Sequence, residues 1–154
     1  MSPLSVTRGK IHDYLGMTFD FSRAGECEVK MDQYVQGRLD DARPDMEGEA
    51  ETPASDHLFT VNDEAKQLDT LDQEYFHTTA AKLLFLSKRV RPEILTAVSF
   101  LCTQTVTPDV DDYKKLARVM RYLQAHLDLK LRLSADGSGL MQWWVDAAYG
   151  VHYD

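Results

Sequence analysis

The sequence is poor in the residues that build disulfide-linked or metal-stapled folds. It has only two cysteines among its 154 residues, Cys27 and Cys102. They lie far apart in ordinary apolar surroundings, which predicts reduced thiols in an intracellular protein, cytoplasmic or nuclear, rather than a disulfide framework. The five histidines show no metal-ligand spacing with one another or with these cysteines.

Long apolar runs are absent as well. No stretch approaches the roughly 18 uninterrupted apolar residues of a membrane helix, and the opening "MSPLSVTRGK" lacks the apolar centre of a signal peptide. The sequence also has no glycine-rich phosphate loop and no nucleophile-elbow pattern. We therefore expect no membrane partner and neither P-loop nor serine-hydrolase chemistry.

Positive charge is scarce overall but concentrated in one region. The net charge is −8, from 25 acids and 17 bases. Residues 40–75 hold twelve acids and two bases, whereas residues 76–135 hold ten bases and five acids. The negative net charge therefore results from residues 40–75, while residues 76–135 are basic. The net charge of the chain does not exclude a polyanionic partner.

The N-terminal part alternates between apolar and polar residues. This pattern covers 11–21 and, after the turn "SRAG", 26–32, which predicts a β-hairpin with one apolar face. Gly16 lies inside the first predicted strand, where a glycine usually marks a bulge or a close backbone approach. Asp32 is expected to cap a short helix over 33–42.

Helices dominate the rest of the chain. Residues 43–67 break the periodicity and predict an extended, mostly surface connection. Helical patterns follow at 72–88, 92–104 and 111–127, and strand patterns at 129–133 and 139–145. The expected fold class is α+β: an N-terminal β-hairpin, three to four mainly helical elements, and C-terminal strands. Expected boundaries are 11–42 for the hairpin and first helix, 43–71 for the acidic connecting segment, 72–133 for the helical region, and 140–154 for the last strand.

Two groups of bases stand out in the helical region. Lys114, Arg118 and Arg121 share one face of the last predicted helix, with Lys115 beside them. Such a ridge suits the phosphates of a nucleic acid, although a solvated helix face has the same pattern. The second group lies between two predicted helices and consists of Lys88, Arg89 and Arg91.

Near the C-terminus, Asp146 ends the apolar run "MQWWV". An aspartate in this position can ligate Mg²⁺, but magnesium takes several oxygen ligands and two-metal phosphodiester chemistry needs a cluster of carboxylates. A lone aspartate at a strand end is more often a turn or cap residue. Both interpretations remain open on the pattern alone.

The motifs in their order resemble a known family. "YLGMTFDF", "ETP", "VRPEI", "RVMRYLQ" and "WWVDAAYG" together resemble the C-terminal part of a copia-type (LTR retrotransposon) reverse transcriptase, running from its thumb and connection region into the start of RNase H. The most specific pieces are "VRPEI" for the family's Thr-Arg-Pro-Asp-Ile, "RVMRYLQ" for Arg-Val-Leu-Arg-Tyr-Leu-Lys, and "VDAAYG" for Ser-Asp-Ala-x-x-Gly. The resemblance covers nearly the whole chain, from Ile11 to Asp154.

The resemblance implies roles for particular residues. Leu15, Gly16 and Met17 match the primer grip, and the helices match the thumb and connection, which follow the primer-template duplex through its backbone. Their implied nucleic-acid-binding bases are Lys88, Arg89, Arg91, Lys114, Lys115, Arg118 and Arg121. Asp146 matches the first RNase H carboxylate, which in an intact site joins further carboxylates around Mg²⁺.

The resemblance also implies missing parts. The polymerase's catalytic aspartates would precede Ile11, and most of RNase H would follow Asp154. We therefore expect a polyprotein fragment that is inactive alone, needs no cofactor, and retains at most weak, non-specific binding to RNA–DNA or DNA duplex beside the rest of the polyprotein.

Two other functions stay open at this point. The chain is also compatible with a non-catalytic remnant of a transposable element whose helices bind another protein. A residual metal-dependent nuclease would use Asp146, Asp154 and an acid from 40–75.

Overall fold

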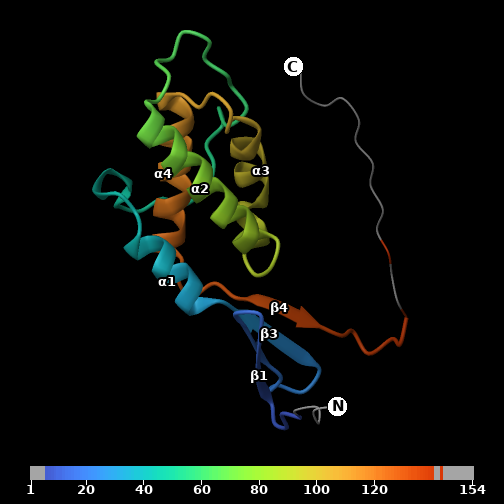
Figure 1. Ribbon diagram of the computed structural model, residues 1–154. Helices are drawn as coiled ribbons and strands as arrows, with labels where there is room; N and C mark the ends of the chain where they lie inside the picture. The colour runs from blue at the N-terminus through green and yellow to red at the C-terminus, as the bar shows by residue number, and fades with distance from the viewer. Residues whose placement is uncertain (1–5, 141–142, 144–154) are drawn as a thin grey trace, which may run out of the picture.

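The structure, a computed structural model, describes residues 6–140 and Trp143. Figure 1 shows a small sheet at one end and a group of helices at the other, joined by α1 and by the start of β4. The sheet has four antiparallel strands in the order β1-β2-β3-β4. The predicted α+β class, with N-terminal hairpin strands, helices and a C-terminal strand, is confirmed.

The sheet joins the two ends of the described chain. Its strands are β1 Ile11–Tyr14, β2 Met17–Asp20, β3 Glu26–Lys30 and β4 Leu131–Ser134. Cys27 pairs with Leu133, so β4 returns from the helices to extend the N-terminal strands. The strand expected at 129–133 therefore exists, shifted slightly, and the residues beyond it at 141–142 and 144–154 lie outside the described part.

The first predicted strand is in fact two strands. Leu15 and Gly16 form a two-residue turn between β1 and β2, with φ angles of +51° and +76°. Two successive positive φ values are those of a type I′ hairpin turn. The prediction of one strand over 11–21, with a bulge at Gly16, was wrong because a leucine at the first turn position kept the alternation intact.

The helices begin and end near the predicted positions. They are α1 Asp32–Asp40, α2 Thr70–Ser87, α3 Leu95–Thr103 and α4 Val110–Ala125, with short 3₁₀ turns η1 Pro44–Met46 and η2 Pro92–Ile94. The expected cap at Asp32 was wrong: Met31 is the N-cap, without a side-chain hydrogen bond, and Asp32 lies in the first helical turn. A carboxylate there favours the helix through its dipole instead.

The start of α4 is fixed by its own acids. Asp109 caps the helix by accepting hydrogen bonds from the backbone N–H groups of Asp111 and Asp112, and the Asp112 carboxylate accepts one from the Asp109 N–H in return. This reciprocal capping box satisfies N–H groups that have no partner inside the helix.

The core lies between α2, α3 and α4. Its fully buried side chains include Phe76, Leu83, Leu86, Val98, Leu101, Leu116, Met120 and Leu123. Residues 43–67 run along the helices as an extended connection, as predicted, but Met46 and Leu58 are buried in this core. The acidic segment is therefore anchored to the helices by apolar contacts. None of the helices in the described residues is long and apolar enough to cross a membrane.

Candidate nucleic-acid interface

The basic ridge of α4 faces the acidic segment. Arg118 donates from Nε to the carbonyl oxygen of Thr52 at 3.1 Å and from Nη2 to its Oγ1 at 2.9 Å. Arg121 donates from Nε to the carbonyl oxygen of Glu47 at 3.0 Å and from Nη2 to that of Asp45 at 2.7 Å. Both guanidinium groups thus hold the backbone of a segment that is distant in sequence.

These acceptors are neutral, which matters for the electrostatics of the ridge. A carbonyl oxygen orients a guanidinium without cancelling its charge, whereas a carboxylate would do both. In the described part of the chain, neither Arg118 nor Arg121 has a carboxylate within salt-bridge distance. The two side chains are partly exposed.

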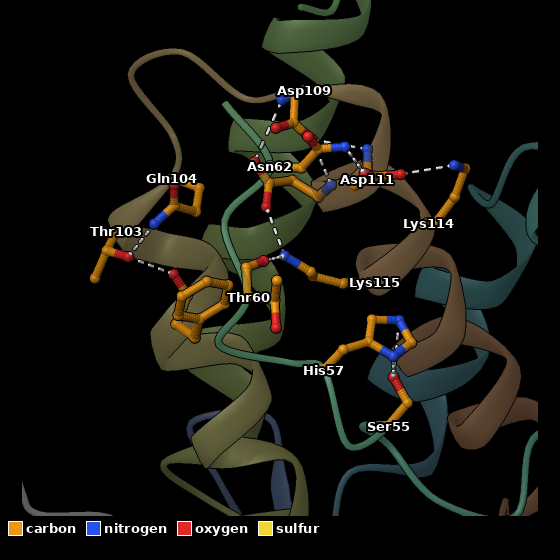
Figure 2. Close-up of polar contacts among 12 residues, drawn as sticks. Ser55, His57, Thr60, Asn62, Thr103, Gln104, Asp109, Asp111, Lys114 and Lys115 are labelled. Carbon is orange, nitrogen blue, oxygen red and sulfur yellow. Dashed lines mark hydrogen bonds and ion pairs between the residues drawn. The ribbon is translucent and has the colours of Figure 1, made fainter. Parts of the chain in front are cut away.

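The two lysines of the ridge differ sharply. Lys114 is exposed and pairs with Asp111 at 2.6 Å. Lys115 is buried; its Nζ donates to the Thr60 carbonyl oxygen at 2.8 Å and lies 3.3 Å from Asp112 (Figure 2). The same ammonium lies 4.9 Å from the centre of the Phe100 ring. Lys115 therefore ties α4, α3 and the acidic segment together and presents little surface to a ligand.

The pKa values of the two acids beside these lysines, Asp111 and Asp112, shift in opposite directions. Hydrogen bonds from Lys114 and Asn62 lower the pKa of the Asp111 carboxyl below its ordinary value of 3.8. Burial raises the pKa of the Asp112 carboxyl, against the hydrogen bonds and positive charge that favour its ionised form. Asp111 thus stabilises the exposed edge of the ridge, and Asp112 belongs to the interior.

The group between α2 and α3 also divides by exposure. Lys88 is exposed at the end of α2. Arg89 is partly exposed, with its guanidinium carbon 3.5 Å from the centre of the Phe85 ring. Arg91 is buried and paired with Glu93, while its Nη1 and Nη2 make no hydrogen bond within the described part of the chain. Of this group, Lys88 and Arg89 remain accessible.

Next to Arg89 lies a cluster that the sequence pattern did not reveal. Tyr34 of α1 packs against Phe85 of α2 with ring centres 5.3 Å apart, and Arg38 lies over Tyr34 at 5.1 Å. The two arginines therefore lie over two partly exposed rings from different helices. The α1 and α2 residues lie far apart in the chain, so only the fold brings them together.

The primer-grip-like residues lie at the first turn of the sheet. Leu15 and Gly16 are exposed, and Met17, at the start of β2, is partly buried against the core. Within the described residues, the hydrogen bonds of Lys114, Arg118 and Arg121 go to Asp111 and to residues 45–52, and none goes to this turn. The turn and the α4 ridge are therefore two separate surfaces.

No magnesium ligand set can be assembled from the described residues. Asp146 and Asp154 lie outside them, and within them no group of three or more histidine, cysteine, aspartate or glutamate side chains gathers as a metal would require. The RNase H-like role of Asp146 therefore stays a prediction. Comparison with protein-family models, curated proteins and solved structures found no match.

Proposed function

We propose that this chain is a fragment of a retrotransposon RNA-directed DNA polymerase and RNase H polyprotein that retains weak, non-specific binding to the backbone of a nucleic-acid duplex. The order of the motifs supports the ancestry. The observation that supports the binding is that Arg118 and Arg121 are oriented by neutral carbonyl oxygens, which leaves their positive charge unpaired. Non-specific binding requires such charges and no contact with base edges.

The burial of individual side chains refines the expected contacts. Lys88 and Arg89 present their charges to solvent and would make direct phosphate contacts. Lys114 is exposed but paired with Asp111, so its contact would exchange that carboxylate for a phosphate. Arg118 and Arg121 would add to the local potential from behind the acidic segment. Arg91 and Lys115 are buried and serve the fold.

Charge reversal tests this proposal. The purified chain is titrated into a short labelled RNA–DNA hybrid at low salt and followed by fluorescence anisotropy, beside the variants Lys88→Glu/Arg89→Glu and Lys114→Glu. Both variants should bind more weakly because each removes phosphate contacts. The matched control Lys10→Glu/Lys66→Glu reverses two exposed lysines elsewhere. Equal affinity of all four chains would reject the proposed surface.

A second candidate is a protein-interaction remnant, and exposed apolar side chains favour it. Phe21, Cys27 and Leu133 line an open hollow of about 410 Å³ at the end of the sheet, and Phe21 and Leu133 are about half exposed. A contiguous exposed apolar patch is typical of partner contacts, and Phe21 and Leu133 are neighbours in this hollow. Salt separates the two functions, since an apolar contact does not weaken as salt rises.

The second candidate also predicts self-association or partner binding through this hollow. Leu133→Asp should abolish this association. The matched control, Leu129→Asp, changes another half-exposed leucine and should leave the association intact. A monomeric chain at high concentration whose sedimentation is unaffected by either change would argue against this hollow as a contact between copies.

A further inference from the structure

The acidic segment and α4 enclose a hollow whose lining includes Lys114, Arg118 and Arg121, three of the cations of the duplex proposal. It has a volume of about 410 Å³ and lies between residues 49–62 and the basic face of α4. Its cationic lining consists of Lys114, Lys115, Arg118 and Arg121, with His57 on the opposite wall. Figure 2 shows His57 and Ser55 on the segment, across from Lys114 and Lys115 on the helix.

The cations around this hollow are held in place before any ligand arrives. Arg118 is fixed by two hydrogen bonds to Thr52, Arg121 by two to Glu47 and Asp45, and Lys115 by one to Thr60. Groups that are already oriented lose little conformational entropy when a ligand binds. The site is thus preorganised for an anion.

The charge balance inside the hollow favours an anion. Four cations line it, against the carboxylates of Glu49 and Asp111, and a third carboxylate, that of Asp112, lies 3.3 Å from the buried Lys115. The excess is therefore one positive charge before His57 is counted. Arginine and lysine together suit a phosphate, which presents several acceptor oxygens to them.

Size and lining define the rest of the ligand. The volume is within the range of small-molecule pockets, roughly 300–1,000 Å³, and is far too small for a duplex. The remaining wall mixes Ala50 with the polar side chains of Ser55, Thr60 and Asn62. The polar groups match hydroxyls, and the imidazole of His57 is the one aromatic ring among the lining residues.

The geometry points to a binding site for a small phosphate monoester with a hydroxylated body, such as a sugar phosphate, between the acidic segment and α4. The site goes beyond duplex binding and does not require it. A phosphate there would also screen the charge of Arg118 and Arg121 and so weaken any duplex contact that depends on them.

Calorimetric titration of the full chain at low ionic strength tests the site, with ribose 5-phosphate as the probe and ribose as the uncharged control. Ribose 5-phosphate should bind and ribose should not. Lys114→Gln removes one exposed cation from the lining and should weaken binding about tenfold, the effect expected for one charge-assisted hydrogen bond. Ser55→Phe leaves every charge in place and should abolish binding by filling the hollow.

Lys88→Gln/Arg89→Gln, which lies outside the hollow, should bind ribose 5-phosphate like the unmodified chain. Thermal unfolding of each variant shows whether it is folded. Absence of binding to the folded, unmodified chain would overturn the inference, as would binding that both Lys114→Gln and Ser55→Phe leave unchanged. A chain that binds ribose 5-phosphate but not the RNA–DNA hybrid keeps this site and rejects the duplex proposal.

Discussion

Arg121 of α4 donates a hydrogen bond of 2.7 Å to the backbone carbonyl oxygen of Asp45, which is 76 residues earlier in the chain. A second bond, from Nε to the carbonyl oxygen of Glu47, makes this guanidinium a fork that holds two points of one loop. The side chain that a sequence pattern assigns to nucleic-acid phosphates thus already has a structural task. Its charge serves both the loop and any anion nearby.

The first prediction concerns this fork. Arg121→Ala should lower the free energy of unfolding by about 1–2 kcal/mol, because two partly exposed hydrogen bonds and the contact over the loop are lost. The Arg121→Lys chain should have a free energy of unfolding between those of the unmodified chain and the Arg121→Ala chain. An ammonium cannot span both carbonyl oxygens as a planar guanidinium does. Urea unfolding measures the change. The control is Lys88→Ala, at an exposed lysine, which should change the free energy of unfolding by less than about 0.5 kcal/mol. An Arg121→Ala chain as stable as the control would show that the fork does not stabilise the loop.

A second prediction concerns the Leu15–Gly16 turn. Asparagine tolerates a positive φ better than leucine does, so Leu15→Asn should stabilise the chain by roughly 0.5–1 kcal/mol. Gly16→Ala should destabilise it by about 1 kcal/mol, through backbone strain rather than a clash, because the nearest side-chain atom to an added Cβ is Met31 Cε at 3.8 Å.

Thermal unfolding of both variants measures these changes. If Leu15 also contacts a nucleic acid, Leu15→Asn should weaken hybrid binding while it raises the melting temperature. A Leu15→Asn chain that is less stable than the unmodified chain, or a Gly16→Ala chain of unchanged stability, would contradict the type I′ geometry of the turn.

A third prediction separates the two members of the Arg91–Glu93 pair. Glu93→Ala leaves a buried guanidinium without its carboxylate and should cost about 3 kcal/mol. Arg91→Met keeps a long side chain against Tyr122 but removes the buried charge and two nitrogens that lack hydrogen bonds in the described residues. It should change stability by less than about 1 kcal/mol. Equal costs for the two variants, measured by urea unfolding, would contradict this view of the pair.

A fourth prediction concerns acid. The pKa of Asp111 lies below 3.8 because Lys114 and Asn62 donate hydrogen bonds to its carboxylate. A carboxyl whose folded pKa is depressed stabilises the fold above its unfolded pKa, and this contribution is lost as pH falls through the folded value. Asn62→Ala should therefore raise the pKa of Asp111 in a carbon-13 NMR titration. The matched change Asn62→Asp adds a negative charge and should raise it further, whereas no change in either variant would remove the role of Asn62.

Much of the fold follows from local sequence signals. The helical patterns at 72–88, 92–104 and 111–127 were recognisable from their apolar spacing, and the acids Asp109, Asp111 and Asp112 at the start of α4 agree with the last of them. The capping box of Asp109 and Asp112 is such a local signal. The Leu15–Gly16 turn was missed because a two-residue turn does not interrupt the alternation of apolar and polar residues. Leu15 is apolar at a position where the alternation of a strand also predicts an apolar residue.

The candidate site could be predicted only in part. Helical spacing placed Lys114, Arg118 and Arg121 on one face, as α4 has them. Their partners are backbone carbonyl oxygens of Thr52, Glu47 and Asp45, which every residue type possesses, so no pattern could identify them. The burial of Lys115 and Arg91 likewise depends on which segments pack over them, which is a tertiary property.

The most direct measurement of the central claim is the affinity of the unmodified chain for a short RNA–DNA hybrid across a series of salt concentrations. Contacts with phosphates make the logarithm of the binding constant fall linearly with the logarithm of the salt concentration, by about 0.9 per phosphate neutralised on B-form DNA. With Lys88, Arg89 and Lys114 as the direct contacts, we predict a slope of about −2 to −3. A folded chain that does not bind at low salt, or that binds with no salt dependence, would contradict the claim.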